Sequence, residues 1–500
     1  MLKLRIGLAD LAADWQPYRD GWASSASTIE PFVNPFIEAL AAADRSGRFV
    51  FCVRERNALE SVTITIDPRD QTLRIRAGSW GTAPLYLMQD GDTLLGSWDP
   101  AELYERLDPA ALNFEAAAPF IAAFAHPYSR RTMFDGVLQL TERSVARWSP
   151  HEPLTIDYPE PIAVPRPRTL REGANPPAIA LEILTASMQR WLVPSGTTGP
   201  QPVGSELSSG LDSAIVAAVA TDFTFPLQTY GLLQNGEPGI GQRLRRQELI
   251  GRFAFVDTAI DAHEFPPLAH GGARIVPWEE IYYDAAAAML RSASRNGMAA
   301  MLTGIGGDEL CLLHRSEDDT KAEADAEPPA FLTRRAREAL RDARLDIAPR
   351  PAIAYSSLEG LAASAPLYLH HGIWPIAPLT TPELFTFARS LPAEWRRGRR
   401  LSREMLARRG CSRLVTHPHS TETFSPLFRH GFARAARPMV RELFAESHLA
   451  DMGLVDAHVL RATYDDYCEG RVGDDFNALP LYATAVLELA LRRMCSEVAA

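Results

Sequence analysis

A run of small, hydroxyl-bearing and acidic residues near the middle of the chain has the composition of an anion-binding loop. The run is Glu206-Leu207-Ser208-Ser209-Gly210-Leu211-Asp212-Ser213. Residues 203–207 predict a strand and 213–220 predict a helix, so N–H groups and hydroxyls would converge at a helix start, where phosphate is favoured. Asp212 would repel that phosphate unless a cation lay between them, which implies Mg²⁺. The alternative is a plain helix cap with an aspartate in its first turn.

A second glycine-rich segment further along the chain also carries acids. It reads Leu302-Thr303-Gly304-Ile305-Gly306-Gly307-Asp308-Glu309-Leu310 and follows a predicted strand at 299–302. Loops at the carboxyl ends of strands in an open parallel sheet face one shared crevice. If strands 203–207 and 299–302 are neighbours, Asp212 and Asp308 can hold one Mg²⁺ jointly. The alternative is a glycine-rich turn that enters a helix.

The composition is that of an ordinary globular protein and excludes several classes. The chain has 500 residues, of which 46% are hydrophobic and 23% charged, and its net charge is -11. This excludes a disordered, collagen-like or coiled-coil chain, and the negative charge argues against nucleic-acid or membrane partners. No apolar run approaches the ~18 residues that span a bilayer. Asp10 and Asp14 interrupt the N-terminus too early for a signal peptide, so we expect a cytoplasmic protein.

The elements that must position the two loops belong to an α/β organisation with three parts. Residues 1–157 contain short strand-like runs at 49–53, 61–66 and 72–75, which predict an antiparallel β-rich domain. Residues 158–177 contain six prolines and predict a linker. From residue 178 to 500, helical patterns alternate with short apolar runs, which is typical of a parallel α/β domain.

Further elements are expected within that last part. Residues 227–232 and 253–259 predict two more strands, and 278–295 predict a helix. The acidic segment 316–329 predicts a surface insertion. Beyond residue 334 the pattern is mainly helical. The five cysteines are scattered and predict buried, reduced thiols rather than a zinc site.

Both motifs resemble those of a known family. SSGLDS resembles the pyrophosphate loop of ATP-pyrophosphatases, and GIGGDEL resembles the GxGxDE segment of asparagine synthetases. In this order they resemble the asparagine synthetase superfamily. Residues 81–86, 96–98 and 132–137 are similar to its N-terminal glutaminase domain. Residues 371–379, 391–392 and 402–404 are similar to the helical half of its synthetase domain.

The resemblance implies a fold and a set of ligands. It implies a degenerate glutaminase-like, Ntn-type domain followed by a parallel α/β synthetase domain of the ATP-pyrophosphatase (adenine nucleotide alpha-hydrolase-like) type with a helical C-terminal part. ATP and Mg²⁺ are the implied cofactors, with Asp212 and Asp308 on the metal. Other residues implied at ATP are Leu207, Ser208, Ser209, Gly210, Ser213, Thr303 and Gly304.

Three departures from the family pattern bear on function. Glutaminases of the family use a cysteine at position 2, where this chain has Leu2, so we expect no glutamine hydrolysis. Ile305 stands where asparagine synthetases have Glu and β-lactam synthetases have Tyr, and it cannot accept a proton. The family's downstream lysine is also missing. His417, His419 or a nearby arginine such as Arg413 would face the phosphates in its place, or both histidines lie on a surface turn.

These departures are similar to those of lasso-peptide macrolactam synthetases. That resemblance implies adenylation of an Asp or Glu side chain of a precursor peptide and closure by the peptide's N-terminal amine, with release of AMP and pyrophosphate. The implied partners are the core peptide, a leader peptidase and leader-recognition proteins. The alternatives are another amide synthetase, of the β-lactam or ammonia-dependent asparagine type, and a non-catalytic partner in a biosynthetic complex.

Overall fold

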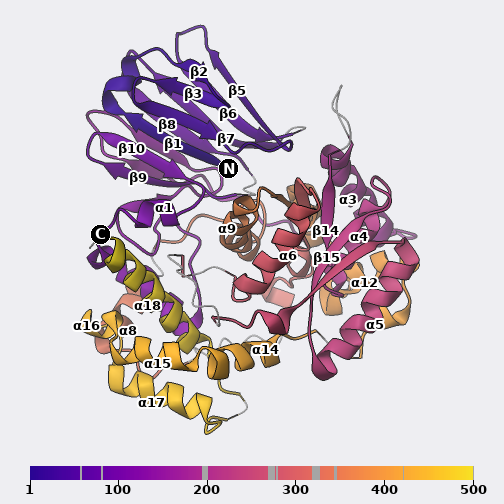
Figure 1. Cartoon of the computed structure of the whole chain (residues 1–500). Helices are drawn as coiled ribbons and strands as arrows, with labels where there is room; N and C mark the ends of the chain where they lie inside the picture. The colour runs from indigo at the N-terminus through magenta and orange to yellow at the C-terminus, as the bar shows by residue number, and fades with distance from the viewer. Residues whose placement is uncertain are drawn as a thin grey trace.

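The computed structural model describes residues 1–56, 59–79, 83–193, 201–268, 276–277, 280–317, 327–342, 346–419, 422–473 and 475–498. Two antiparallel sheets form the N-terminal part, and a parallel sheet with helices forms the rest (Figure 1). The mixed α/β architecture with a β-rich N-terminus and a helical C-terminus is therefore confirmed. The Ntn-type and ATP-pyrophosphatase assignments, like the domain boundaries, stay predictions.

The two N-terminal sheets pack face to face. Alternation explains the packing, because Phe51 and Val53 on one strand and Ile64 and Ile66 on the next are buried while the residues between them are less so. Trp22 from the other sheet lies 5.3 Å from Phe51, centroid to centroid. The seven-stranded sheet contains β1 (Leu2–Gly7), β2 (Gln16–Tyr18), β3 (Gly21–Ser24), β4 (Ser27–Pro31), β9 (Tyr86–Asp90), β10 (Thr93–Ser97) and β11 (Val137–Gln139). The six-stranded sheet contains β5 (Ile37–Ala43), β6 (Phe49–Glu55), β7 (Leu59–Asp67), β8 (Thr72–Ala77), β12 (Val145–Trp148) and β13 (Thr155–Asp157).

The third sheet is parallel and has the order β16-β15-β14-β17-β18. Its strands are β14 (Val203–Glu206), β15 (Gln228–Leu233), β16 (Val256–Asp261), β17 (Ala300–Leu302) and β18 (Trp374–Ile376). The condition set for the two loops to meet is fulfilled, because β14 and β17 are neighbours. The chain leaves β14 toward β15 on one side and returns as β17 on the other, so the two loops border the point where the strand order reverses.

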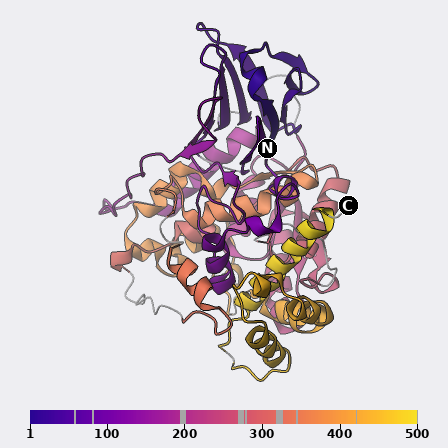
Figure 2. The same cartoon turned by 90° about the vertical axis from the view of Figure 1, so that its left-hand side faces the viewer.

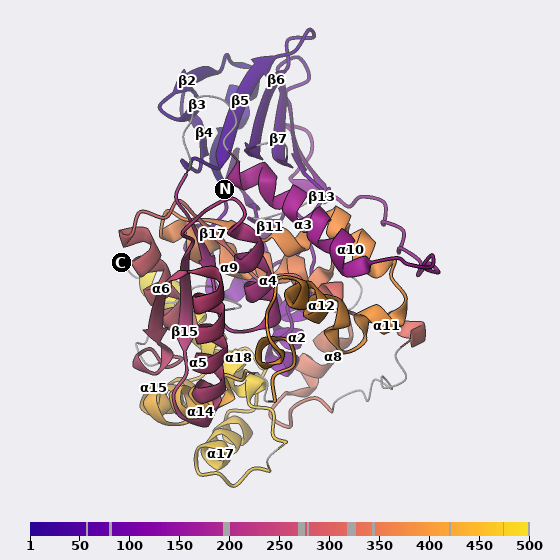
Figure 3. The ribbon, with the colours of Figure 1, turned by 90° about the vertical axis from the view of Figure 1, so that its right-hand side faces the viewer.

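Helices cover both faces of this sheet. In Figure 1, α6 (Tyr283–Arg295) and α9 (Tyr355–His370) lie on one side of β14 and β15. Figure 3 shows α3, α4 and α12 close together on the other side. These are α3 (Pro176–Leu192), α4 (Leu211–Ala220) and α12 (Arg400–Arg408), and α5 (Gly236–Phe253) flanks them. Helix α4 is almost wholly buried and rich in alanine, so it packs closely between the sheet and its neighbours.

The remaining helices lie in the N-terminal part, beside the parallel sheet and in the C-terminal part. They are α1 (Ala101–Tyr104), α2 (Phe114–Ala123), α7 (Gly307–Leu310), α8 (Arg334–Asp342), α10 (Pro382–Arg389), α11 (Ala393–Arg396), α13 (Arg413–Thr416), α14 (Ser425–His430), α15 (Arg437–Ala445), α16 (His448–Asp451), α17 (Ala457–Cys468) and α18 (Leu479–Val498). In Figure 2 the dark purple helix α2 lies among the orange and yellow C-terminal helices, and it contacts α8 and α18. None of the helices in the described ranges is long and apolar enough to cross a membrane.

Several predicted boundaries differ from the structure for physical reasons. Phe253 ends α5, so the strand predicted at 253–259 begins only at Val256. The helix predicted from residue 278 begins at Tyr283, and residues 278–279 lie outside the described residues. Strand β18 was not predicted, because it has three residues and Pro375 is one of them.

The predicted linker at 158–177 and the predicted insertion at 316–329 differ in part from the structure. Residues 158–175 contain no helix or strand, and α3 begins inside the predicted linker at Pro176. Most of the predicted insertion, residues 318–326, lies outside the described residues. Its beginning is not a free surface, because Glu317 accepts a hydrogen bond of 2.7 Å from the fully buried Arg396. All five cysteines are free thiols, as predicted, but only Cys311 and Cys411 are buried and the other three are partly exposed.

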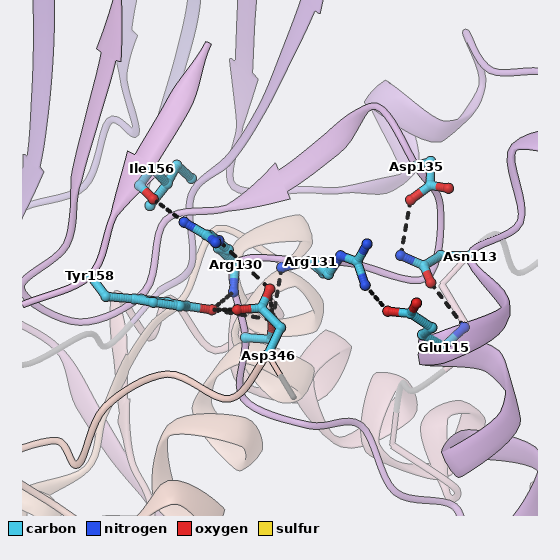
Figure 4. Close-up of polar contacts among 9 residues, drawn as sticks. Asn113, Glu115, Arg130, Arg131, Asp135, Ile156, Tyr158 and Asp346 are labelled. Atoms are coloured by element: carbon cyan, nitrogen blue, oxygen red, sulfur yellow. Dashed lines mark hydrogen bonds and ion pairs between the residues drawn. The ribbon is translucent and has the colours of Figure 1, made fainter. Parts of the chain in front are cut away.

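Polar contacts fasten the N-terminal part to the rest of the chain. In Figure 4, the Tyr158 hydroxyl at the start of the linker donates to Asp346 at 3.0 Å. The Arg130 guanidinium donates to the Ile156 carbonyl at 2.7 Å and lies 3.6 Å from the Asp346 carboxylate. Elsewhere, the Asn34 amide donates to the carbonyl of Ala299, directly before β17, at 2.9 Å. The sheet that carries the site is thus held from the N-terminal side.

The N-terminal part and the rest of the chain share their hydrophobic cores. One cluster of buried side chains includes Ile6 and Ile64 together with Leu207 and Leu302. A second cluster joins residues of β9, α1 and α2 to those of α15, α17 and α18. Leu2 is a fully buried member of the first cluster.

Candidate active site

The loop after β14 is held by its own hydroxyl groups. The Ser208 N–H donates to Ser213 Oγ at 3.1 Å, and the Gly210 N–H donates to Ser208 Oγ at 2.9 Å. The two serine hydroxyls lie 3.0 Å apart. The loop therefore gathers two hydroxyls and the start of α4 at one point, as an oxyanion site requires.

The loop after β17 packs directly against α4 because it is made of glycine. A Cβ atom on Gly304 would lie 2.9 Å from the Ser213 nitrogen, and one on Gly307 would overlap with Asp212 Cγ. Gly306 has a φ of 93°, which favours glycine. These glycines let α7 begin beside Asp212 and bring Asp308 to the same place.

Asp212 and Asp308 converge on one cation, the guanidinium of Arg399. Arg399 forms an ion pair with Asp212 and another with Asp308, the latter at 2.9 Å. The Asp212 side chain is 19% exposed and that of Asp308 is 74% exposed. Burial raises the pKa of Asp212 to about 6, although the Arg399 charge acts in the opposite direction. The two carboxylates thus share the positive charge of Arg399, and their role in holding Mg²⁺ stays a prediction.

A cavity of about 360 Å³ opens beside the first loop. Its floor is the carboxyl ends of β14 and β15, and its walls come from α6 and α9. The polar residues in its lining are Glu206, Ser208, Asp212, Ser213, Tyr230, Glu280, Tyr282, Ser364 and Tyr368. Apolar residues such as Leu232, Met289, Leu367 and Phe424 line the rest. The cavity therefore extends from the predicted phosphate site into a mostly apolar chamber.

Glu206 is a carboxylate inside this chamber. It accepts a hydrogen bond from the Tyr368 hydroxyl of α9 and one from the Gly304 N–H. Burial raises the pKa of Glu206 to about 7, and the Glu280 charge acts in the same direction. Glu206, at the end of β14, thus contacts the second loop at Gly304, the residue before Ile305.

The other residues predicted at ATP lie around the same loops. Leu207 is fully buried and lines the cavity. The buried Thr303 hydroxyl has no hydrogen-bond partner among the described residues, and Thr303 is not among the residues that line the cavity. Ser209 has a φ of 121°, a conformation that favours glycine, and its hydroxyl is held by Arg245 and by Glu422 at 3.1 Å. The family's glycine is therefore replaced by a residue held by two side chains.

The two predicted histidines are not gathered into this cavity. His417 and His419 are both exposed, and neither is among its lining residues. His417 Nδ1 lies 3.0 Å from the hydroxyl of its neighbour Thr416. This arrangement corresponds to the alternative of a surface turn.

The sequence analysis missed three residues at this site, which are Arg399, Tyr368 and Glu422. Arg399 lies in the segment Arg396-Arg397-Gly398-Arg399-Arg400, where nothing in the sequence separates one arginine from the next. The only signal for it was the missing family lysine, which left the site in need of a cation. Tyr368 belongs to an ordinary helical pattern and carries no signal.

Comparison with protein families matches residues 193–348 to the family described as asparagine synthase. The match supports the asparagine synthetase superfamily. It covers both loops, Glu206, Asp212 and Asp308, whereas Tyr368 and Arg399 lie beyond it. A comparison with curated proteins found no match. In the part of the chain that the structure describes, no group of three or more His, Cys, Asp or Glu side chains forms a metal site. The asparagine synthase domain indicates an ATP-dependent ligase that forms amides.

Replacing Arg399 by methionine should lower the free energy of unfolding by about 1–2 kcal/mol, because Asp212 and Asp308 would lose their shared counter-ion in a partly buried place. Urea unfolding at neutral pH measures this. Arg400→Met is the matched control, because the Arg400 guanidinium lies over the Trp395 ring and is exposed. Equal stability of the two variants would contradict a structural role for the Arg399 ion pairs.

Proposed function

We propose that the protein is an ATP-dependent peptide macrolactam synthetase of the lasso-peptide type. It activates an Asp or Glu side chain of a precursor peptide as the acyl-adenylate, and the peptide's N-terminal amine closes the ring. ATP is a substrate, and AMP and pyrophosphate are products. The observation that carries the ligase chemistry is the convergence of Asp212 and Asp308 on one cation beside the hydroxyl-bearing loop.

A peptide amine as nucleophile is supported by two features. The chain has Leu2 in the core where a glutaminase would have its thiol, so it lacks that source of ammonia. The cavity is also large and mostly apolar, with a volume of about 360 Å³, and suits a side chain and backbone better than free ammonia.

The chain's own residues have separate tasks in this proposal. The hydroxyls of Ser208 and Ser213 and the start of α4 bind the leaving pyrophosphate. Leu207, which lines the cavity, faces the nucleoside. Asp212 and Asp308 suit Mg²⁺, because their oxygen atoms already share a cation. When bound, Mg²⁺ would neutralise charge on the pyrophosphate.

The proposal extends to the setting of the reaction. The enzyme acts in the cytoplasm on a core peptide that a leader peptidase and a leader-recognition protein have prepared. It uses neither nucleic acid nor a membrane as a partner. The predicted roles of His417 and His419 are not needed in this scheme.

Mass spectrometry of a reaction with Mg·ATP tests the proposal. One arm contains linear core peptides from precursor genes beside this gene, and a second arm contains aspartate with ammonia. The expected result is a peptide lighter by one water, together with AMP and pyrophosphate. Asparagine in the second arm would instead establish the small-molecule synthetase, and absence of AMP in both arms would contradict the ligase.

A further inference from the structure

The inner end of the cavity carries an arrangement that the phosphate chemistry does not use. Glu206 accepts hydrogen bonds from Tyr368 and from the Gly304 N–H, and Glu280 stands at the exposed rim of the same cavity. Phosphate carries negative charge, so two carboxylates in one chamber are unsuited to it. They suit a positively charged or proton-donating ligand.

We propose that this end of the cavity is the subsite for the attacking primary amine, and that Glu206 accepts the amine's proton. This inference rests on the proposed function and names the nucleophile's place within it. Ile305 cannot accept a proton, whereas Glu206 contacts the backbone of the residue just before Ile305.

The position of Glu206 is fixed from three directions. Tyr368 approaches from α9, the Gly304 N–H approaches from the loop after β17, and the strand β14 holds the Glu206 backbone. The titratable groups that face Glu206 or share its cavity are Asp212, Tyr230, Glu280, Tyr282 and Tyr368. A carboxylate held in this way is oriented before the amine arrives, which general base catalysis requires.

Attack of the amine on the acyl-adenylate forms the amide and releases AMP and one proton. The amine nitrogen forms a bond to the carbonyl carbon of the acyl-adenylate, and the bond from that carbon to the AMP oxygen breaks. AMP leaves with the electron pair of that bond. The amine proton moves to the Glu206 carboxylate, which later releases it to solvent.

Titration of Glu206 gives a readout that needs no substrate. Its folded-state pKa of about 7 lies above the usual 4.5, so the folded protein binds the proton more tightly than the unfolded chain does. The ionised Glu206 therefore costs no stability below about pH 4.5, costs increasingly more as the pH rises from about 4.5 to about 7, and costs a constant amount above that. Glu206→Gln should gain Tm relative to the unaltered protein between pH 5 and pH 7 and keep that gain at pH 8. Parallel Tm profiles for the two proteins would contradict the assignment.

Binding of a small primary amine tests the subsite directly. Glycinamide, which carries a peptide-like N-terminal amine, should raise the Tm of the full chain at pH 8 by about 2 °C near saturation. N-acetylglycinamide lacks the amine and should not. The shift should disappear in Glu206→Gln and persist in Glu264→Gln, an exposed glutamate outside the cavity. No shift in the unaltered protein, or an equal shift in Glu206→Gln, would overturn the proposal.

A kinetic test separates this inference from the proposed function. With a core peptide that the unaltered protein cyclises, Glu206→Gln should retain adenylation, measured as exchange of labelled pyrophosphate into ATP, while ring closure and AMP release fall about 100-fold. Loss of this exchange with a raised KM for ATP would show that Glu206 binds the nucleotide and overturn the inference. If the unaltered protein forms no AMP, the proposed function fails, whereas the glycinamide result still decides whether an amine subsite exists.

Discussion

Replacing Asp212 by asparagine should lower the rate of ATP-dependent AMP formation about a thousandfold. The variant keeps the size of the side chain but loses the charge that the site presents to a cation. Asp212 lies in the first turn of α4, against the glycines of the second loop. Release of pyrophosphate, measured in the presence of the core peptide, follows the same step.

Asp222→Asn is the matched control for this experiment. Asp222 lies just beyond the other end of α4 and forms an ion pair with Arg409 at 2.7 Å. Its loss should change the rate less than about twofold, because a partly exposed pair contributes little. If Asp212→Asn kept most of its activity, the phosphate chemistry would have to lie elsewhere, and the non-catalytic alternative would gain support.

Replacing Gly307 by alanine should lower AMP formation by at least about 100-fold, through displacement rather than loss of charge. An alanine Cβ would overlap with the Asp212 side chain, so either Asp212 or the start of α7 has to move. The distance between Asp212 and Asp308 would then change.

The control is Gly251→Ala, because no atom lies within 4 Å of a Cβ at that position in α5. It should retain full activity and gain about 0.5–1 kcal/mol in the free energy of unfolding, since alanine favours the helix. Thermal unfolding of both variants distinguishes a local displacement at Gly307 from a general loss of structure. Full activity in Gly307→Ala would contradict the packing described here.

Local patterns predicted most of the elements that position the site. The alternation in β6 and β7 and the strand–loop–helix pattern around 203–220 depend on neighbours in sequence, so they can be recognised there. The sequence did not predict that β14 pairs with β17, and the meeting of Asp212 with Asp308 was predicted only on that condition. The convergence of Asp212 and Asp308 follows from that pairing.

Local sequence patterns could not predict elements and side chains whose position depends on contacts distant in the sequence. Strand β18 exists because β17 offers it an edge, not because Trp374-Pro375-Ile376 favours a strand. Gly398 and Arg399 both have positive φ, and this sharp turn directs the Arg399 side chain to the carboxylates. Arg396, three residues earlier, is fully buried and binds Glu317 instead. A sequence of similar arginines does not reveal which one turns inward.

The shared hydrophobic clusters have a consequence for how the chain can be shortened or changed. Cutting at the linker would leave α2 without α18 and uncover apolar faces on both fragments. Residues 1–157 and 178–500 should therefore melt as one cooperative unit and aggregate when expressed apart. The N-terminal part would then serve as an internal scaffold, because its removal would expose apolar surface on the rest of the chain.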